Sequence, residues 1–266
     1  MANYIHAEIL CEAYTHLDID IFDDKEALAE LKNKLLPFFS ERAKFLLGND
    51  VEVKIEFEEG SLKTRLMVIG SAGAILLSNL SAGMSAYGSF RQGVEQLSKD
   101  STTLAQSANL EVLFRTKTAY CDRVRVEKRK GVFGRVDELL SQLDGIKIDL
   151  SGEKLPTNEK ALGTIDKAIT NLVGWNDKAG NLFEKLDSDV TKGCISAGLA
   201  EELEKLPETL AWVVELETRS FRMQVANSDP AFAGKIASTA ARYKATIAAI
   251  RRQMLARVND HAPAKV

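Results

Sequence analysis

Hydrophobic and polar residues alternate strictly at two places within the first sixty residues of the chain. From Ile5 to Ile21 the apolar side chains fall on one side of an extended chain, and most charged ones fall on the other. The run 51–58, VEVKIEFE, alternates in the same way. A period of two is typical of a strand with one buried face, so both stretches are predicted strands. The first is long for one strand, and we expect a bend or break between Tyr14 and His16.

Between these strands the pattern changes to the three- and four-residue spacing of a helix. Asp23 or Asp24 is positioned to cap its N-terminus, and Glu26 suits its first turn. The apolar stripe consists of Leu28, Leu31, Leu35 and Leu36. Pro37 is expected to kink this helix or to end it, because proline lacks the amide that a helix interior needs.

After Ser61 the pattern predicts helices almost throughout, with one further short strand where Ile146, Ile148 and Leu150 alternate. Turn formers and charges between 151 and 160 predict a boundary, giving an α+β domain over 1–150 and an all-α domain over 151–266. Helices are expected from about Thr157, around 175–186, around 199–225 and over 229–259. The predicted fold is therefore α+β and predominantly helical, with a small N-terminal sheet packed with helices and then a helical bundle.

The segment 66–90, LMVIGSAGAILLSNLSAGMSAYGSF, contains no charged residue. We expect it to be helical, and three interpretations are open: one buried helix or two short ones packed inside a soluble helical core, a constitutive membrane span, or a span stored in a soluble fold and released on a signal. The first is favoured, because five serines and Asn79 offset the apolar gain of inserting the segment in lipid. The residues that would face lipid in a span are Leu66, Ile69, Ile75, Leu76, Leu77 and Leu80.

Eight basic and two acidic residues crowd the stretch from Arg115 to Arg135, directly before and across a Gly-Val-Phe-Gly turn at 131–134. Such a cluster is suited to contact phosphates of nucleic acid or of anionic lipid. The candidate contacts are Arg123, Arg125, Lys128, Arg129, Lys130 and Arg135. The simpler alternative is the solvated end of a helix, with the basic residues favoured by the helix dipole and Gly131 as a left-handed cap.

Composition and motifs give little support to catalysis or to a bound cofactor. The net charge is -3, and the hydrophobic and charged fractions of 45% and 27% are those of an ordinary globular protein. The sequence contains none of the common nucleophile, phosphate-loop, zinc-protease or dinucleotide motifs. His16, Asp18 and Asp20 share a strand face that could hold a metal, but a polar face in water has the same pattern. We therefore expect no metal and no cofactor.

The three cysteines are too far apart for a disulfide framework or a zinc knuckle, which favours a reducing compartment. Cys121 lies within the basic run, where neighbouring cations could lower the pKa of a thiol. We expect a small buried thiol there instead. Trp175 and Trp212 both fall in helical stretches and are expected to belong to the core.

Three short motifs occur in order: Gly60-Ser61-Leu62-Lys63, Tyr87-Gly88-Ser89-Phe90-Arg91, and Arg129-Lys130-Gly131 with Gly134. This pattern, over about 51–140, resembles a loosely defined set of uncharacterised bacterial proteins. The resemblance implies no established activity and no functional residues. It suggests a role in bacterial defence or in a stress response.

Together these features favour a non-enzymatic interaction or effector protein, with membrane association through 66–90 as one form of it. Its expected partners are proteins or further copies of itself, and its expected location is the cytoplasm, with contact to the inner face of the membrane under the span interpretation. A nucleic-acid-binding module that uses the basic run is the first alternative. An enzyme of a type that the motifs do not reveal is the second.

Overall fold

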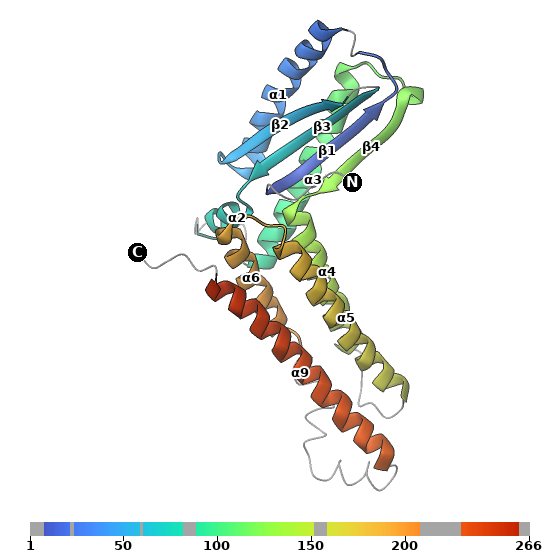
Figure 1. Cartoon of the computed structure of the whole chain (residues 1–266), viewed down its shortest axis with the longest axis vertical. Helices are drawn as coiled ribbons and strands as arrows, with labels where there is room; N and C mark the ends of the chain where they lie inside the picture. The colour runs from blue at the N-terminus through green and yellow to red at the C-terminus, as the bar shows by residue number, and fades with distance from the viewer. Residues whose placement is uncertain are drawn as a thin grey trace. The chain divides into compact units, whose positions relative to one another are not determined.

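The computed structural model of the protein describes residues 8–21, 24–58, 61–81, 89–151, 159–207 and 230–260. It confirms the α+β, predominantly helical fold class, because a small four-stranded sheet accompanies long helices (Figure 1). The strands are β1 (Ile9–Leu17), β2 (Val51–Glu58), β3 (Leu62–Gly70) and β4 (Arg123–Lys130). The helices are α1 (Lys25–Leu47), α2 (Ala72–Ser81), α3 (Phe90–Arg115), α4 (Val132–Ser151), α5 (Glu159–Phe183), α6 (Asp189–Glu204) and α9 (Pro230–Asp260), with a 3-10 turn, η1 (Tyr120–Asp122).

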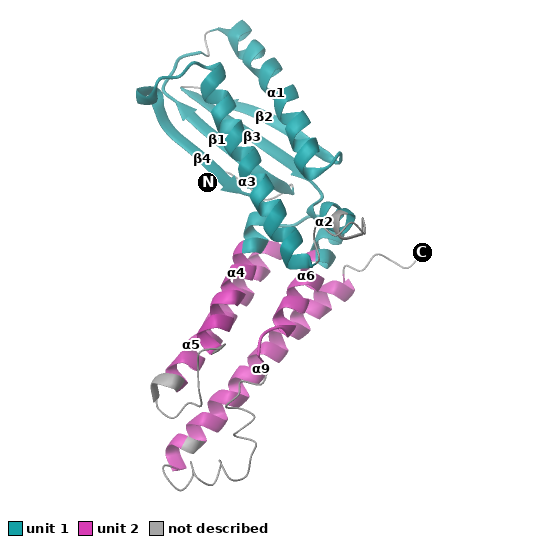
Figure 2. Cartoon of the chain, turned by 180° about the vertical axis from the view of Figure 1, so that it is seen from behind, with its two compact units in different colours: residues 1–137, 185–194, 265–266 teal, residues 138–184, 195–264 magenta. Residues whose placement is uncertain are grey.

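The described chain divides into two compact units. Unit 1 consists of residues 1–137 and 185–194 with the last two residues, and unit 2 of residues 138–184 and 195–264 (Figure 2). The division falls inside α4, whereas the composition of 151–160 predicts a boundary after it. Residues 152–158 lie outside the described part of the chain, so the predicted boundary stays a prediction.

The sheet of unit 1 has the strand order β2-β3-β1-β4, and every neighbouring pair is antiparallel. With α1 between β1 and β2, and α2 and α3 between β3 and β4, the order is the split β-α-β arrangement of ferredoxin-like domains. Helices α1 and α3 both cover one face of this sheet, as the two opposite views show (Figures 1 and 2). The other face, called the open face below, carries none of the described helices of unit 1.

The two predicted strands are confirmed, and their alternation explains the layers. The apolar side of β2 packs under α1, while the glutamates of β2 point to the open face and are exposed. β1 is continuous from Ile9 to Leu17 and ends one residue after the expected bend or break near Tyr14 to His16, with residues 18–21 outside the strand. The register shifts between Ile9 and Cys11 against β3, and between His16 and Leu17 against β4, where the extra residue is Val124 of β4.

Helix α1 begins as the sequence predicts but does not end at its proline. Asp24 is the N-cap, and its carboxylate accepts a hydrogen bond from the amide of Ala27 at 2.9 Å. The helix continues through Pro37 to Leu47. Leu35 and Phe39, on either side of the proline, are both buried against unit 1, and this packing offsets the hydrogen bond that Pro37 cannot make.

The prediction of helix for the charge-free segment 66–90 is wrong at its beginning. Residues 66–70 are the second half of β3, which lies between β1 and β2 in the sheet. Leu66 and Val68 face the helices, and Met67 on the open face is also buried, so the strand has the continuous apolar sequence of an element covered on both faces. Periodicity does not distinguish such a run from a buried helix.

The segment then turns at Ser71 into α2, and residues 82–88 lie outside the described part. Of the six residues assigned to lipid contact, Leu66, Ile75 and Leu76 are buried within unit 1, whereas Ile69 is half-buried and Leu77 is 48% exposed. Leu80 falls where side chains are not described. In the portion of the chain that the structure covers, no helix combines the length and the apolar character that crossing a bilayer requires.

Helix α2 is held at its N-terminus by two side chains of unit 1. The carboxylate of Glu8 accepts a hydrogen bond from the amide of Ala72 at 2.7 Å, and the hydroxyl of Thr191 accepts one from the amide of Gly73 at 2.9 Å. These contacts satisfy amides that a helix start leaves without an internal partner. The start of α2 is therefore fixed to the rest of unit 1.

The elements described in unit 2 are all helices. The alternation at Ile146, Ile148 and Leu150 does not form the predicted strand, because these residues lie in α4. Trp175 of α5 is 1% exposed and donates a hydrogen bond to the carbonyl of Leu139 at 2.8 Å, which confirms its predicted core position. Trp212 lies outside the described residues, as does most of the helix predicted over 199–225; α6 begins ten residues earlier, at Asp189.

The apolar stripe predicted for the last helix is confirmed in α9, which packs along α5. Its buried members are Ile236, Ala240, Tyr243, Ile247, Ile250 and Met254. Steps of three and four residues place all of them on one side of the helix, so the stripe is the surface that α9 buries in unit 2.

Candidate polyanion-binding surface

The basic run predicted as a helix end is instead an edge strand. Residues 123–130, RVRVEKRK, form β4, which pairs with β1 on one side. Of the residues proposed for anion contact, Arg123, Arg125, Lys128, Arg129 and Lys130 lie on β4, and Arg135 lies in the first turns of α4. The alternation of arginine and valine over 123–126 is the period-two signal that identifies this strand, and the density of charge obscures it.

Pairing with β1 assigns the cations of β4 to the two faces of the sheet. Arg129 is opposite Glu12 and Arg125 is opposite His16, so both belong to the open face. Lys128 alternates to the helix-covered face, where its ammonium donates a hydrogen bond to Gln106 of α3 at 3.2 Å. β4 therefore presents cations on both faces of the same edge.

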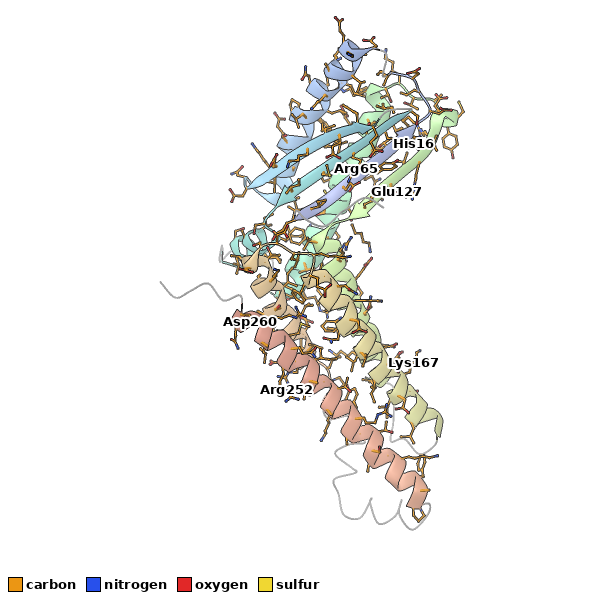
Figure 3. All side chains as sticks on the ribbon, in the orientation of Figure 1. His16, Arg65, Glu127, Lys167, Arg252 and Asp260 are labelled. Carbon is orange, nitrogen blue, oxygen red and sulfur yellow. The ribbon has the colours of Figure 1, made fainter. Side chains whose placement is uncertain are left out.

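The centre of the open face is a buried carboxylate between two arginines. Glu12 is 1% exposed, and its Oε1 atom accepts hydrogen bonds from Nε of Arg65 at 3.2 Å and from Nη1 of Arg129 at 2.7 Å. Arg65 also donates to Glu56 at 3.0 Å, and Arg129 donates to Glu127 at 2.8 Å. Figure 3 shows Arg65 and Glu127 on this face. The network links all four strands across the open face.

Burial raises the pKa of Glu12, even though its hydrogen bond and charge attraction with Arg65 act in the opposite direction. Its second oxygen, Oε2, is buried and has no hydrogen-bond partner among the residues that the structure describes. The guanidinium of Arg129 lies 4.2 Å from the centre of the Tyr14 ring, so the same cation also stacks on an aromatic side chain. Arg129 is thus oriented by three neighbours on the sheet and is part of its structure.

Exposed aromatic rings flank the start of β4, and sequence patterns did not single them out. Tyr120 of η1 is 85% exposed, and the guanidinium of Arg123 lies 5.5 Å from its ring centre. Phe114, near the end of α3, is 72% exposed and has Arg115 at 5.8 Å. Exposed aromatic rings beside cations occur where proteins stack unpaired bases. The signal that could have found them is the interleaving of aromatic and basic residues over 114–125.

A polar side chain of α3 fixes β4 against the rest of the sheet. Asn109 is 3% exposed; its amide donates a hydrogen bond to the carbonyl of Glu127 at 2.8 Å. Its carbonyl oxygen accepts one from the hydroxyl of Thr15 on β1 at 2.7 Å. One side chain therefore joins α3, β1 and β4, and the edge strand is a rigid support for its cations.

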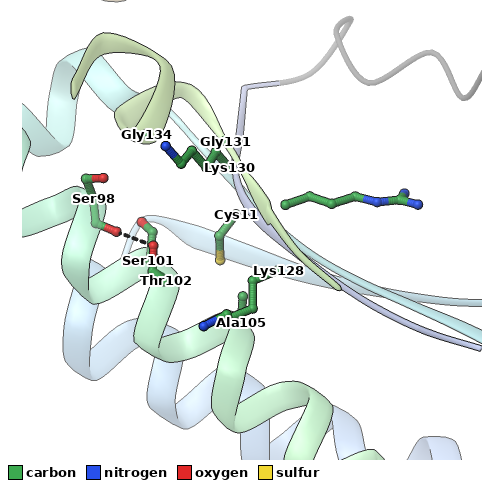
Figure 4. A pocket seen from close by; sticks show the side chains of 10 residues that line it. Cys11, Ser98, Ser101, Thr102, Ala105, Lys128, Lys130, Gly131 and Gly134 are labelled. Atoms are coloured by element: carbon green, nitrogen blue, oxygen red, sulfur yellow. Dashed lines mark hydrogen bonds between the residues drawn. The ribbon is translucent and has the colours of Figure 1, made fainter. Parts of the chain in front are cut away.

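A cavity of about 170 Å³ lies between α3 and the end of β4, on the helix-covered face (Figure 4). Ser98, Ser101 and Thr102 of α3 line one side, and Lys128 and Lys130 line the other. The thiol of Cys11 also lines the cavity. Burial, reinforced by the charge of Glu12, raises the pKa of this thiol to about 12, so it is neutral near pH 7.

The glycine at the end of β4 is explained by close packing and not by a helix cap. Gly131 follows a strand, and the only described glycine with a positive φ is Gly48. A Cβ atom at Gly131 would overlap the backbone carbonyl of Leu10. The predicted left-handed cap is therefore wrong: β1 and the β4–α4 connection approach so closely here that only glycine fits.

The remaining candidates for chemistry are separate in the structure. His16 hydrogen-bonds Ser61 at 2.6 Å, and among the described residues no three His, Cys, Asp or Glu side chains are grouped as metal ligands would be. Cys121 is exposed, so its predicted burial is wrong. Cys11, Cys121 and Cys194 are all free thiols.

No protein-family model, no curated protein and no solved structure matches this chain. The resemblance to uncharacterised bacterial proteins stays a prediction. The functional interpretation therefore depends on the geometry of unit 1 alone.

Proposed function

We propose that the protein is a non-enzymatic interaction protein whose unit 1 binds single-stranded nucleic acid along β4 and the adjoining η1 turn. The observation that carries this proposal is the combination of an exposed basic strand with the exposed, arginine-flanked ring of Tyr120. Cations along a strand follow a phosphate backbone, and an exposed ring accepts a base regardless of its identity.

The charge of β4 is local and large compared with that of the whole chain. Five of its eight residues are basic and one is acidic, which gives 5 - 1 = +4 on a chain whose net charge is -3. Contacts to phosphate release condensed counterions, so a strand with several such contacts binds more tightly as salt is lowered. A basic edge can support this binding even though the whole molecule is acidic.

The alternative is that these charges only protect the edge of the sheet. Exposed basic residues are a common device against unwanted strand pairing, and they need no ligand for that purpose. The exposed ring of Tyr120 distinguishes the two possibilities. Edge protection requires charge and no aromatic side chain, whereas base stacking requires the ring.

The test is fluorescence anisotropy of a labelled single strand of about 16 nucleotides with the full chain, measured at several salt concentrations. Replacing both Arg123 and Lys128 by Glu should weaken binding at least tenfold and reduce the slope of log K against log salt by about 1.4, because two contacts are lost. Tyr120→Ala should weaken binding by about 1–3 kcal/mol while leaving the salt slope unchanged.

A matched control reverses two exposed lysines of α1, Lys32→Glu with Lys44→Glu. This helix packs beside β2, the opposite edge of the sheet, so the net charge changes equally without touching β4. If both double variants weaken binding to the same degree, or if the native chain does not bind the strand at low salt, the proposal is wrong.

A further inference from the structure

The sheet of unit 1 ends in two edge strands of equal length and opposite charge. β2 and β4 each have eight residues, and within the described residues each pairs with a single neighbouring strand. On the open face β2 presents Glu52, Lys54, Glu56 and Glu58, whereas β4 is predominantly basic. The free edges are separated by the whole width of the sheet, so they meet only between two molecules.

The order of charges on one edge is the complement of the order on the other. Along the open face β4 has Arg125, Glu127 and Arg129, and β2 read in the opposite direction has Glu56, Lys54 and Glu52. The single acidic residue of the basic strand therefore faces the single basic residue of the acidic strand. Arg123 lies beyond the register shift of β4 and pairs with Leu17, so the charge match extends over residues 125–129.

We propose that β4 of one molecule pairs antiparallel with β2 of a second copy, so that the sheets of successive copies join. The alignment places Arg125 opposite Glu56, Glu127 opposite Lys54 and Arg129 opposite Glu52, and all eight residues of each strand overlap. Opposite charges directly across neighbouring strands stabilise such a pair, and backbone hydrogen bonds complete it. The partner is a second copy of the chain, because the free β2 edge of that copy carries the charge order complementary to β4.

Shifts of this pairing by two residues oppose like charges. Sliding β2 by two residues in either direction places Glu127 opposite a glutamate, Glu56 or Glu52, and places an arginine opposite Lys54. Pairing β4 with a second β4 brings together two strands that each carry a net charge of +4, and the register centred on Glu127 places that residue opposite itself. Like charges directly opposite are destabilising, so the charge order favours the β4–β2 pair in this register.

The helix-covered face agrees with this alignment. Val126 of β4, which is opposite Thr15 on this face, is 43% exposed, which is unusual for a valine on the apolar side of a strand. In the proposed register Val126 is opposite Ile55 of the neighbouring copy. Sheet extension would therefore cover an exposed valine with an apolar side chain.

Four strands that alternate in direction also determine the orientation of the next copy. Because β2 and β4 point in opposite directions within one sheet, an antiparallel β4–β2 contact leaves both molecules in the same orientation. Each copy then still has one free β2 and one free β4. Such a contact is heterologous and produces chains of copies that remain open or close into a ring.

The proposal does not depend on nucleic-acid binding, although both use β4. The experiment is therefore sedimentation velocity of the full chain after nuclease treatment, over rising protein concentration, at about 0.05 M and about 1 M salt. Concentration-dependent association at low salt that weakens at high salt is the expected result. A chain that stays monomeric at every concentration in low salt overturns the proposal.

A charge-swap cycle tests the register. Lys54→Glu and Glu127→Lys each put like charges opposite in the contact, and each should weaken association about fivefold. The double variant restores an opposite pair between copies and should associate more tightly than either single variant, although Glu127→Lys also removes the intramolecular ion pair with Arg129. Within one chain the two residues lie on opposite edges, roughly 14 Å apart across two intervening strands, so recovery requires contact between copies.

The cycle also separates this proposal from the function proposed above. Lys54→Glu leaves β4 unchanged, so it should weaken association while the affinity for a single strand stays native. Circular dichroism and thermal unfolding of each variant establish that the chain is folded. If the double variant associates no better than the two single variants, or if neither single variant weakens association, the proposed contact is wrong.

Discussion

At the scale of single residues, Glu12 of β1 is 1% exposed although it lies on the open face of the sheet. The alternation of β1 places Glu12 on the polar face, and the structure agrees. Its burial depends on Arg65 and Arg129, which reach it from two neighbouring strands. Neither strand was predicted, so the alternation alone does not indicate that a carboxylate on the open face is covered. Cross-strand contacts of this kind require the sheet order, which local pattern does not contain.

Gly131 provides a residue-scale prediction. Gly131→Ala forces a Cβ atom into the backbone of Leu10 and should cost about 3 kcal/mol or more of the free energy of unfolding, measured by urea denaturation. Gly145→Ala is the matched control, because a Cβ atom there has no neighbour within 4 Å. In the middle of α4 this control should stabilise the chain by about 0.5–1 kcal/mol. Equal effects at the two positions would contradict the close-packing explanation.

At the scale of elements, the strands that alternate cleanly were predicted and the others were not. β2 has an exposed glutamate or lysine at every second position, which marks one face as solvated. β3 has no such contrast over residues 66–70, because Met67 on the open face is buried as deeply as Leu66 and Val68. β4 has charges on both faces, since an edge strand beside only one neighbour leaves room for solvent on each side. Helices with one apolar stripe, such as α9, were predicted well, because their apolar and polar faces are clearly distinct in the sequence.

Helix α2 tests the membrane interpretation of the charge-free segment. Leu76 is fully buried within unit 1, so Leu76→Arg should abolish folding, because it places an unpaired charge in the core at a cost above about 4 kcal/mol. Leu77→Arg is the control, since Leu77 is 48% exposed and should tolerate arginine. The measurements are the yield of folded protein and its circular dichroism. If both variants stayed folded and moved from a membrane fraction to the soluble one, a span would explain the segment better than the core.

At the scale of the whole molecule, helix content and the α+β class followed from composition and periodicity. The division between residues 137 and 138 falls inside α4, where the sequence pattern has no break because the helix continues through it. The boundary predicted from turn formers over 151–160 stays a prediction. The split β-α-β order was not predicted, because it can be recognised only when β3 and β4 are both identified as strands.

Two units with separate cores should also have separate stabilities. Leu35 of α1 is 0% exposed in the core of unit 1, and Ile247 of α9 is 1% exposed in the core of unit 2. Replacing either by Ala should cost about 2–5 kcal/mol, but within its own unit. Hydrogen exchange measured by mass spectrometry shows which unit loses stability: Leu35→Ala should speed exchange in β2 and β3, and Ile247→Ala should speed it in α5 and α9.

The two outcomes distinguish separate units from one cooperative molecule. Because local opening reports the stability of the unit that opens, faster exchange in all four elements for both variants would show that the molecule unfolds as one. Exchange confined to the mutated unit would show that nucleic-acid binding and sheet extension can be studied in unit 1 without changes in unit 2.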